Sequence, residues 1–222
     1  MLKWDYRRLT LETLLRYASN VNKKCGYSNI WGFIDGTFYR PTENQRLVSS
    51  GYKRAHGFKY QAVVTPDGLI TSLFGPMEGK IGDWNMLKES GLEDILKNIN
   101  SLFPDGHHLY IYGDPAYSEG YGIMGPFKLT PSHLVLTREE SEFNVRMSGV
   151  RIAVEQLFGL VLNKWAYNGY KYGLRQQSTA VAAHYMVSVL LTNIQTCLEG
   201  GNEVSQSFHC IPPSLDDYLK LD

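Results

Sequence analysis

The chain has 222 residues, of which 43% are hydrophobic and 20% are charged. This is enough apolar material for one well-buried core, and it excludes a disordered chain. The 22 basic and 22 acidic residues give a formal net charge of zero. A stand-alone nucleic-acid binder usually carries a basic excess, so any contact with DNA must use a local patch or a partner.

Cysteine usage and hydropathy indicate the cellular compartment in which the protein resides. The three cysteines are odd in number and far apart, with neither a CxxC pair nor a disulfide framework, which favours a reducing compartment. The first 20 residues lack the uninterrupted apolar core of a signal peptide. No run reaches the roughly 18 apolar residues that a membrane helix needs. We therefore expect a soluble intracellular protein with no membrane partner.

The first part of the chain predicts one helix and three strands. The helix is predicted over residues 9–24, and the strands are predicted over residues 31–35, 58–64 and 69–74. Gly26 is expected to end the helix. The first strand is expected to stop at Asp35 and to turn at Gly36. Thr65-Pro-Asp-Gly68 between two apolar runs is a strong hairpin signal, so these strands should be consecutive and antiparallel.

The second part of the chain predicts mainly helices. In order, we expect a helix over 84–99 that Gly91 interrupts, a strand over 108–114, a loop over 115–132, a short strand over 134–137, a helix from Val150 and a last helix over 176–197. The pair Gly200-Gly201 should end this last helix.

This order of elements predicts an α/β fold with a mixed sheet, three antiparallel strands first and flanking helices. It is also the order of elements in an RNase H-like fold. We divide the chain into an N-terminal helical lead-in (1–29), one domain (30–198) and a C-terminal tail (199–222). The tail carries Pro212-Pro213 and scattered acids, and we expect it to be a loosely held extension.

Three acidic residues stand out by their placement. Asp35 follows Phe-Ile and precedes Gly-Thr, and Asp114 follows Tyr-Ile-Tyr-Gly and precedes Pro-Ala-Tyr. Glu155 lies within the amphipathic pattern that begins at Val150. A sheet fixes the direction of carboxylates at its strand ends, where water and substrate reach them. Such acids can hold two hard cations about 3.5–4 Å apart for phosphodiester cleavage, and Mg²⁺ favours a few carboxylates plus substrate oxygens.

Each acid also has a simpler interpretation. Aspartate before Gly or Pro at a strand end is often a turn former, which applies to Asp35 and Asp114. Glu155 and Arg151 have the spacing of an i,i+4 helix pair. Glu155 nevertheless shares a flank with Phe158, near the buried stripe. On spacing alone, these alternatives outweigh a metal site.

Five blocks of the chain, in order, resemble one known family. They are Phe33-Ile-Asp35-Gly-Thr37; Gly51-Tyr-Lys-Arg-Ala-His-Gly-Phe-Lys-Tyr-Gln61; Phe74-Gly-Pro76 with Asp83-Trp-Asn-Met-Leu87 and Ser90-Gly-Leu92; Tyr112-Gly-Asp114-Pro-Ala-Tyr117; and Phe143-Asn144 and Arg151 with Val154-Glu155-Gln-Leu-Phe-Gly159. Together they resemble the catalytic domain of PIF/Harbinger-type transposases and of the Harbinger transposase-derived nucleases. These are DDE-superfamily enzymes with an RNase H-like fold. The resemblance covers roughly residues 30 to 195.

The resemblance implies a metal-dependent DNA endonuclease that hydrolyses phosphodiester bonds by a two-metal mechanism. It assigns Asp35, Asp114 and Glu155 as both the catalytic and the metal-binding triad, with Mg²⁺ or Mn²⁺ as the cofactor. DNA is the implied partner, and the nucleus is the implied location. No organic cofactor is implied, and an oligomer stays open.

The chain departs from the family pattern in two places. Gly82 stands where the family commonly has His, and the following Asp83 is predicted to be a helix N-cap before Trp84. Relatives usually carry an N-terminal helical DNA-binding region, whereas about 30 residues precede the first predicted strand here. We therefore expect DNA targeting to come from elsewhere, for instance from a separate DNA-binding partner protein.

Basic residues concentrate between the first two predicted strands. They are Arg40, Arg46, Lys53, Arg54, His56 and Lys59. A basic loop beside a carboxylate cluster would hold phosphates near the metals, so Lys53, Arg54, Lys59 and Arg151 are candidate DNA contacts. A solvated loop with ordinary charges is the equally weighted alternative.

A second basic group lies among aromatic residues after the glutamate helix. It consists of Lys164, Lys171 and Arg175 beside Trp165, Tyr167, Tyr170 and Tyr172. Such residues can grip a single strand, although packing of the aromatic rings at the core and rim is the favoured interpretation. The histidines have no partner at zinc-ligand spacing, and no glycine-rich phosphate loop occurs in the sequence.

Two rival functions remain beside the nuclease. A domesticated, catalytically inactive transposase core can act as a protein- or DNA-binding module. The intact triad argues against this module, because acids that repel one another cost stability without a metal. A carboxylate–metal hydrolase of small phosphoesters is the third possibility, and only the generic chemistry of the acids supports it.

Overall fold

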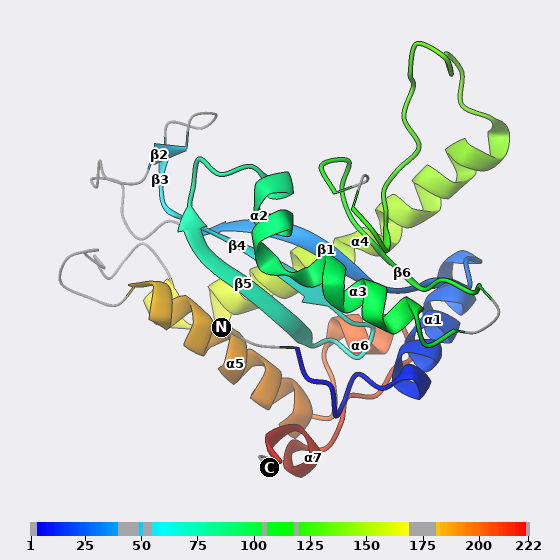
Figure 1. The fold of residues 1–222 in the computed structure, drawn as a ribbon. Helices are drawn as coiled ribbons and strands as arrows, with labels where there is room; N and C mark the ends of the chain where they lie inside the picture. The colour runs from blue at the N-terminus through cyan, green and yellow to red at the C-terminus, as the bar shows by residue number, and fades with distance from the viewer. Residues whose placement is uncertain are drawn as a thin grey trace.

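The computed structural model of the chain describes residues 4–39, 49–50, 55–103, 106–117, 120–168 and 181–220 (Figure 1). It confirms a mixed α/β architecture, in which an open five-stranded mixed sheet is flanked by helices. In Figure 1, α2 (Asp83–Ser90) and α3 (Leu92–Asn100) lie in front of the sheet, and α4 (Arg138–Lys164) passes behind it. The prediction that Gly91 interrupts the helix over residues 84–99 is confirmed, because Gly91 separates α2 from α3.

The sheet begins with three antiparallel strands, as predicted. Its strands are β1 (Ile30–Tyr39), β4 (Phe58–Val64), β5 (Ile70–Glu78), β6 (Tyr110–Tyr112) and β7 (Ile123–Met124), in the order β5-β4-β1-β6-β7. Strand β1 pairs with β4 and β4 with β5 in antiparallel register, whereas β6 is parallel to both β1 and β7. The predicted hairpin at Thr65-Pro-Asp-Gly68 joins β4 to β5. A separate ribbon consists of β2 (Ser49–Ser50) and β3 (Ala55–His56).

The remaining helices follow their local signals. They are α1 (Leu11–Cys25), the short 3-10 turn η1 (Ala166–Asn168), α5 (Val181–Leu198), α6 (Glu203–Ser207) and α7 (Leu215–Leu219). Thr10 caps α1 by accepting from the Thr13 N–H, and Gly26 ends it with a left-handed φ of 83°. The predicted first helix and its end at Gly26 are therefore confirmed.

The first strand is longer than predicted. β1 continues through Asp35 and Gly36 to Tyr39, because β4 pairs with it all the way to Tyr39, which faces Phe58. The predicted turn at Gly36 is wrong. The pairing of β1 with the shorter β6 nevertheless ends at Phe33, so the β6 side of β1 is open from Asp35 onward.

The region before the glutamate also differs from the prediction. Helix α4 begins at Arg138 rather than at Val150, since Thr137 and Glu140 form a reciprocal capping box. The predicted strand over 134–137 is absent, and its residues Leu134 and Val135 are largely exposed. The short strand β7 lies within the predicted loop, where only two residues pair with β6.

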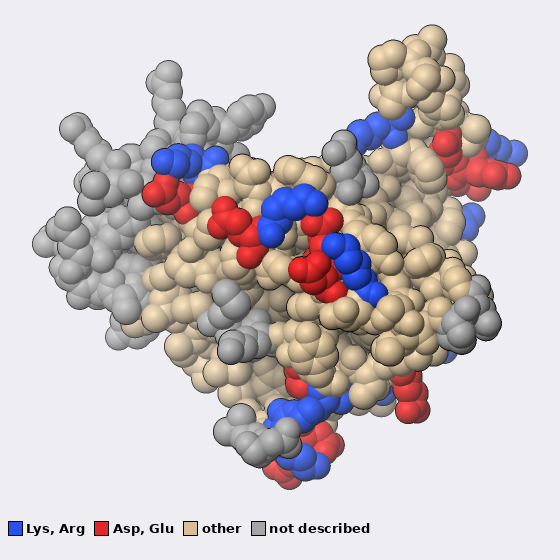
Figure 2. Space-filling view, viewed as in Figure 1, with Lys and Arg blue, Asp and Glu red and all other residues tan. Residues whose placement is uncertain are grey.

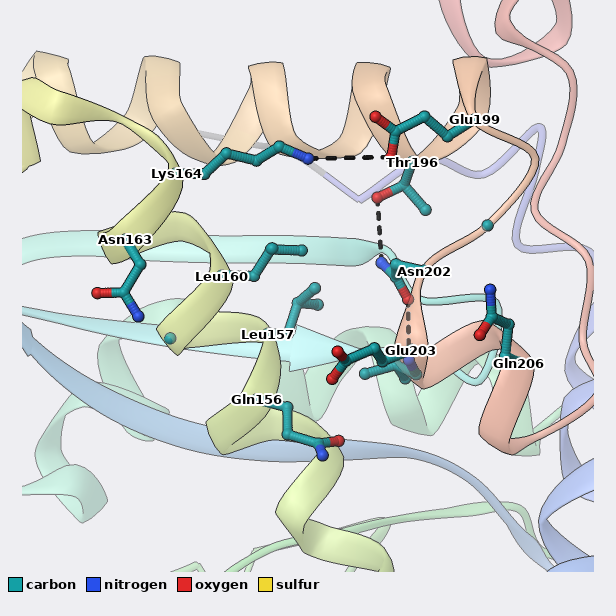
Figure 3. Close-up of a pocket in the computed structure, with 13 residues that line it drawn as sticks. Gln156, Leu157, Leu160, Asn163, Lys164, Thr196, Glu199, Asn202, Glu203 and Gln206 are labelled. Carbon is teal, nitrogen blue, oxygen red and sulfur yellow. Dashed lines mark hydrogen bonds and ion pairs between the residues drawn. The ribbon is translucent and has the colours of Figure 1, made fainter.

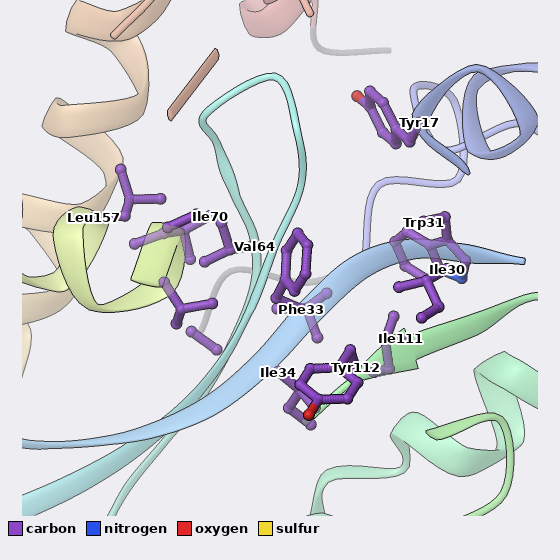
Figure 4. Close-up of a cluster of buried hydrophobic side chains, with 14 of the residues drawn as sticks. Tyr17, Ile30, Trp31, Phe33, Ile34, Val64, Ile70, Ile111, Tyr112 and Leu157 are labelled. Atoms are coloured by element: carbon purple, nitrogen blue, oxygen red, sulfur yellow. The ribbon is translucent and has the colours of Figure 1, made fainter. Parts of the chain in front are cut away.

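A continuous apolar core joins the sheet to the helices on its α4 side. Figure 4 shows Phe33, Val64 and Ile70 of the sheet close to Leu157 of α4. Trp31 and Phe33 are fully buried within β1. This packing fixes β1 against α4, which carries the predicted glutamate.

The N-terminal segment is tied to the β4–β5 turn by a buried ion pair. Arg8 Nη1 lies 3.1 Å from Asp67 Oδ2, and Asp67 is fully buried in the hairpin turn. Asp67 also accepts hydrogen bonds from the Tyr17 hydroxyl at 2.5 Å and from the Thr65 hydroxyl at 2.5 Å. The buried carboxylate is therefore fully compensated by neighbours from α1, the lead-in and its own turn.

The C-terminal residues are packed against the core, in contrast to the loose extension that was expected. Phe208 is buried, and its ring centroid lies 5.6 Å from that of Phe33 in β1. The Tyr218 hydroxyl accepts a hydrogen bond from Asn193 Nδ2 at 3.0 Å, which ties α7 to α5. No helix in the described part of the chain combines the length and the apolar character that a bilayer crossing demands.

Candidate active site

Two of the predicted acids follow the last residue pair that joins β1 to β6. In this parallel pairing Phe33 of β1 faces Tyr112 of β6. Asp35 and Asp114 each come two residues later; Asp35 still lies in β1, whereas Asp114 lies beyond the end of β6. Asp114 contributes to the raised pKa of Asp35, so the two carboxyl groups interact electrostatically. The two acids therefore lie near the same ends of these two strands.

Asp35 is held in a largely desolvated position. Its side chain is 15% exposed, its Oδ1 accepts from the Gly36 N–H at 2.8 Å, and its Oδ2 lies 2.9 Å from Arg151 Nη1. Burial raises the pKa of Asp35 to about 6, and the negative charges of Asp114 and Asp83 act in the same direction. Arg151 and the Gly36 N–H oppose this rise without cancelling it. The desolvation of Asp35 therefore outweighs the stabilisation that Arg151 gives its charged form.

Glu155 reaches the site through an arginine. Arg151 Nη2 lies 3.2 Å from Glu155 Oε1, one helical turn along α4, while the Nη1 of the same guanidinium binds Asp35. The Glu155 side chain is 59% exposed. The predicted i,i+4 pair therefore exists, and it is joined to the strand acid by one shared cation.

A fourth acid lies near the same strand, and sequence reasoning gave it another role. Asp83 was predicted to be the N-cap of a helix, but Gly82 is the N-cap of α2 and Asp83 is the first helical residue. Its Oδ1 lies 2.8 Å from Lys59 Nζ and accepts a hydrogen bond from the Tyr117 hydroxyl at 3.2 Å. The N-cap prediction is therefore wrong.

Gly36 makes room for this fourth acid. A Cβ atom at Gly36 would lie 2.4 Å from Asp83 Oδ1 and 3.3 Å from both Lys59 Cε and the Tyr117 hydroxyl. Burial and the three aspartates Asp83, Asp35 and Asp114 raise the pKa of the Tyr117 phenol, which stays a neutral hydrogen-bond donor. The glycine after Asp35 is thus required by close packing, where the sequence suggested a turn.

The candidate DNA contacts are only partly described by the structure. Lys53 and Arg54 lie outside the described residues. The Lys59 ammonium is 16% exposed as a side chain and is bound to Asp83 and to the Ile81 carbonyl at 3.2 Å. Arg151 is 28% exposed and bound to the two acids. Of the second basic group, Lys164 lies 3.9 Å from Glu199, and Lys171 and Arg175 are outside the described residues.

Surface charges give little sign of a nucleic-acid track on one face. Figure 2 shows Lys and Arg side chains alternating with Asp and Glu side chains over the described residues of this view. No continuous basic field forms among them on this face. This agrees with the neutral net charge.

A separate cavity of about 470 Å³ lies between α4, α5 and α6 (Figure 3). Its lining includes Gln156, Leu160 and Asn163 from α4, with Glu199 at the end of α5 and Glu203 in α6. None of the three predicted acids lines it. The cavity is therefore distinct from the acid site, although Gln156 directly follows Glu155.

The comparison with known protein families matches the part of the chain that contains these acids. A family model described as DDE superfamily endonuclease matches residues 34–193. The chain belongs to this family. The match begins one residue before Asp35 and ends in α5, so it includes all three predicted acids. The chain also resembles a transposase over 68% of its own length.

That relative is a probable transposase for insertion sequence element IS702 from Microchaete diplosiphon, which is 25% identical over 164 residues. The alignment covers 68% of this chain and 54% of the relative, so the chain spans about half the length of the transposase. No solved structure gave a significant match to the chain.

DDE superfamily endonucleases generally use divalent metal ions, and the charges of this site fit such an ion in part. The donors are all carboxylates, the hard oxygen ligands that Mg²⁺ and Mn²⁺ prefer. Among the ion pairs of the described residues, Asp83 is paired with Lys59, and both Asp35 and Glu155 are paired with Arg151. In the described residues, however, no three acidic, histidine or cysteine side chains gather closely enough to hold one ion. The guanidinium of Arg151 stands between two of the predicted ligands.

The space around Gly82 predicts that the chain tolerates the histidine that the family commonly has at this position. A Cβ atom at Gly82 would meet no atom within 4 Å. We expect Gly82→Ala and Gly82→His to change the free energy of unfolding by less than about 1 kcal/mol, because only an N-cap preference is altered. Urea denaturation measures this change, and a loss well above that value for Gly82→His alone would show that the position is crowded.

Proposed function

We propose that the chain is a transposase-derived, metal-dependent DNA endonuclease in which Asp35, Asp114 and Glu155 are the catalytic and metal-binding residues. The observation that carries the proposal is the electrostatic interaction between Asp35 and Asp114, which each follow by two residues the last pair, Phe33 and Tyr112, that joins β1 to β6. The family match, which encloses these acids, supports the same chemistry. Mg²⁺ or Mn²⁺ is the proposed cofactor.

The side chains have distinct tasks in this proposal. Asp35 in β1 and Asp114, two residues beyond β6, would bind the ion, and Glu155 would complete the set from α4. Divalent ions, when bound, supply an activated water and stabilise the leaving oxygen of the phosphodiester. Arg151, Lys53 and Arg54 are proposed to hold DNA phosphates. Lys59 is proposed in the same role, and its pairing with Asp83 implies that DNA would have to displace it.

Several finer assignments belong to this proposal. The Harbinger subtype and nuclear localisation rest on the resemblance of the sequence blocks alone. The RNase H-like fold is supported by three antiparallel strands followed by parallel β6 and β7. DNA as the substrate is supported by the family and by the transposase relative. A separate DNA-binding partner is supported by the neutral charge, and an oligomer remains open.

The test is a nicking assay on supercoiled plasmid DNA. Wild-type protein, Asp114→Asn and Asp94→Asn would be incubated with Mg²⁺ or Mn²⁺ and with EDTA. We expect nicking by the wild type and by Asp94→Asn, because Asp94 is an exposed surface acid, 80% accessible and paired with Lys97. Asp114→Asn should lose nicking, since it removes a proposed ligand.

Absence of nicking together with absence of Mn²⁺ binding by calorimetry would overturn the nuclease. It would favour the second candidate, an inactive transposase core that acts as a binding module, an interpretation that Gly82 in place of the usual histidine also supports. Nicking that requires an added DNA-binding protein would identify a two-component system.

A further inference from the structure

One guanidinium connects the two elements that carry the proposed ligands. Arg151 Nη1 contacts Asp35 of β1 at 2.9 Å, and Nη2 contacts Glu155 of α4 at 3.2 Å. The planar fork of arginine suits this arrangement, because its nitrogens can serve two carboxylates at once. Arg151 therefore occupies the position between two acids that a bound cation would otherwise fill.

The other cation near the strand is engaged elsewhere. Lys59 is bound to Asp83 and to the Ile81 carbonyl, at the Gly36 side of β1. Neighbouring side chains alternate between the two faces of a strand, so Asp35 presents its carboxylate to the face opposite Gly36. Among the described ion pairs of Asp35, Arg151 is its cationic partner.

The two ends of the bridge that Arg151 forms differ in their exposure to water. Asp35 is 15% exposed and Arg151 is 28% exposed, whereas the Glu155 end is 59% exposed. The Coulomb attraction between an arginine and a carboxylate is stronger at such a shielded site than at the surface, although burial also costs the two groups their hydration. The contact with Asp35, rather than the contact with Glu155, therefore determines how strongly the Arg151 guanidinium resists displacement by another cation.

We propose that Arg151 is a positioning residue that acts as the resident counterion of the site, and that a divalent ion occupies Asp35 only by displacing its guanidinium. The proposal rests on the proposed function. Displacement leaves Arg151 beside Glu155 with free donors, and an arginine freed from a carboxylate is a bidentate phosphate ligand. Metal loading would thus convert a carboxylate-binding arginine into a phosphate-binding one.

The experiment measures Mn²⁺ affinity by calorimetry for wild type, Arg151→Met and Arg138→Met. Arg138 offers a matched control, because it forms the same i,i+4 pair with Glu142 on the same helix and is 91% exposed. We expect Arg151→Met to bind Mn²⁺ about tenfold more tightly than wild type, the size of one charge-assisted hydrogen bond. Arg138→Met should bind Mn²⁺ as the wild type does.

A second readout separates displacement from a purely structural role. Wild-type protein should bind a short DNA duplex about fivefold more tightly with Mn²⁺ than with EDTA, and Arg151→Met should lose most of this gain. Arg151→Lys keeps the charge but not the fork, so its Mn²⁺ affinity should lie near that of the wild type. Circular dichroism melting confirms that each variant is folded, and Arg151→Gln replaces Arg151→Met if the latter is not.

In that replacement, Arg151→Gln also removes the guanidinium charge, and Mn²⁺ affinity should rise as it does for Arg151→Met. Equal or weaker Mn²⁺ binding by folded Arg151→Met would overturn the counterion role while leaving the nuclease in place. Absence of Mn²⁺ binding in the wild type would instead overturn the proposed function itself.

Discussion

Replacing Asp35 by asparagine is expected to stabilise the metal-free protein by about 2–3 kcal/mol at pH 7 and to abolish nicking. Burial raises the pKa of Asp35 to about 6, which is roughly two units above its ordinary value of 3.8. Each unit corresponds to about 1.4 kcal/mol against the charged form. Asparagine keeps the shape of the side chain and removes this cost, but it also removes a proposed metal ligand.

The stabilisation depends on pH in a defined way. Between pH 3.8 and about 6, folded Asp35 holds a proton that the unfolded chain releases, so the free energy of unfolding of the wild type falls as the pH rises. Above about pH 6 the full cost is present, and below pH 3.8 it vanishes. The gain from Asp35→Asn should therefore be largest at pH 7 and absent at acidic pH.

Urea denaturation in EDTA at several pH values measures this gain, with Asp94→Asn as the control. Asp94 is 80% exposed, so its replacement should change the free energy of unfolding by less than about 0.5 kcal/mol. Added Mn²⁺ should stabilise the wild type but not Asp35→Asn, because the ion binds only the folded protein. A stability of Asp35→Asn at or below that of the wild type at pH 7 would contradict the desolvated carboxylate.

Replacing Arg8 by methionine is expected to lower the free energy of unfolding by about 3–5 kcal/mol, because it strands a buried charge. Asp67 is fully buried and loses its cationic partner at 3.1 Å, while the Tyr17 and Thr65 hydroxyls remain as donors. For a chain of this size, the loss corresponds to a fall of about 10 °C in the melting temperature.

The neighbouring arginine provides the matched control for this substitution. Arg7 pairs with Asp5 at 3.6 Å, and its side chain is 43% exposed. Arg7→Met should change the melting temperature by only about 1–2 °C. Equal losses in Arg7→Met and Arg8→Met, measured by differential scanning calorimetry, would show that the Arg8–Asp67 pair does not hold the lead-in to the hairpin.

The sequence predicts those elements of the fold whose signals are local. Thr65-Pro-Asp-Gly68 predicts the β4–β5 hairpin, and Gly26 and Gly91 predict helix ends, because each motif needs only its own backbone conformation. The continuation of β1 beyond Asp35 depends on β4, a distant partner. The early start of α4 had a local signal in the Thr137–Glu140 capping box, which periodicity alone overlooks.

The candidate site shows the same division between local and long-range information. The sequence identifies Asp35, Asp114 and Glu155 as individual acids, but the parallel pairing of β1 with β6 just before two of them joins segments about 80 residues apart in the chain. The sequence predicts that Arg151 forms an i,i+4 pair with Glu155, whereas the structure shows that Arg151 also pairs with Asp35. Likewise, Gly36 reads as a turn former, although the close approach of Asp83 is what requires it.

The first and last described segments of the chain line one hollow, which has a consequence for limited proteolysis. Asp5, Arg7 and Arg8 line this hollow together with Pro213, Asp217 and Lys220. Each segment therefore covers part of the other, and local unfolding of one should expose the other. Cleavage by a protease should accordingly appear in both segments together, at a lower free energy than the unfolding of the sheet. None of the three acids lines this hollow.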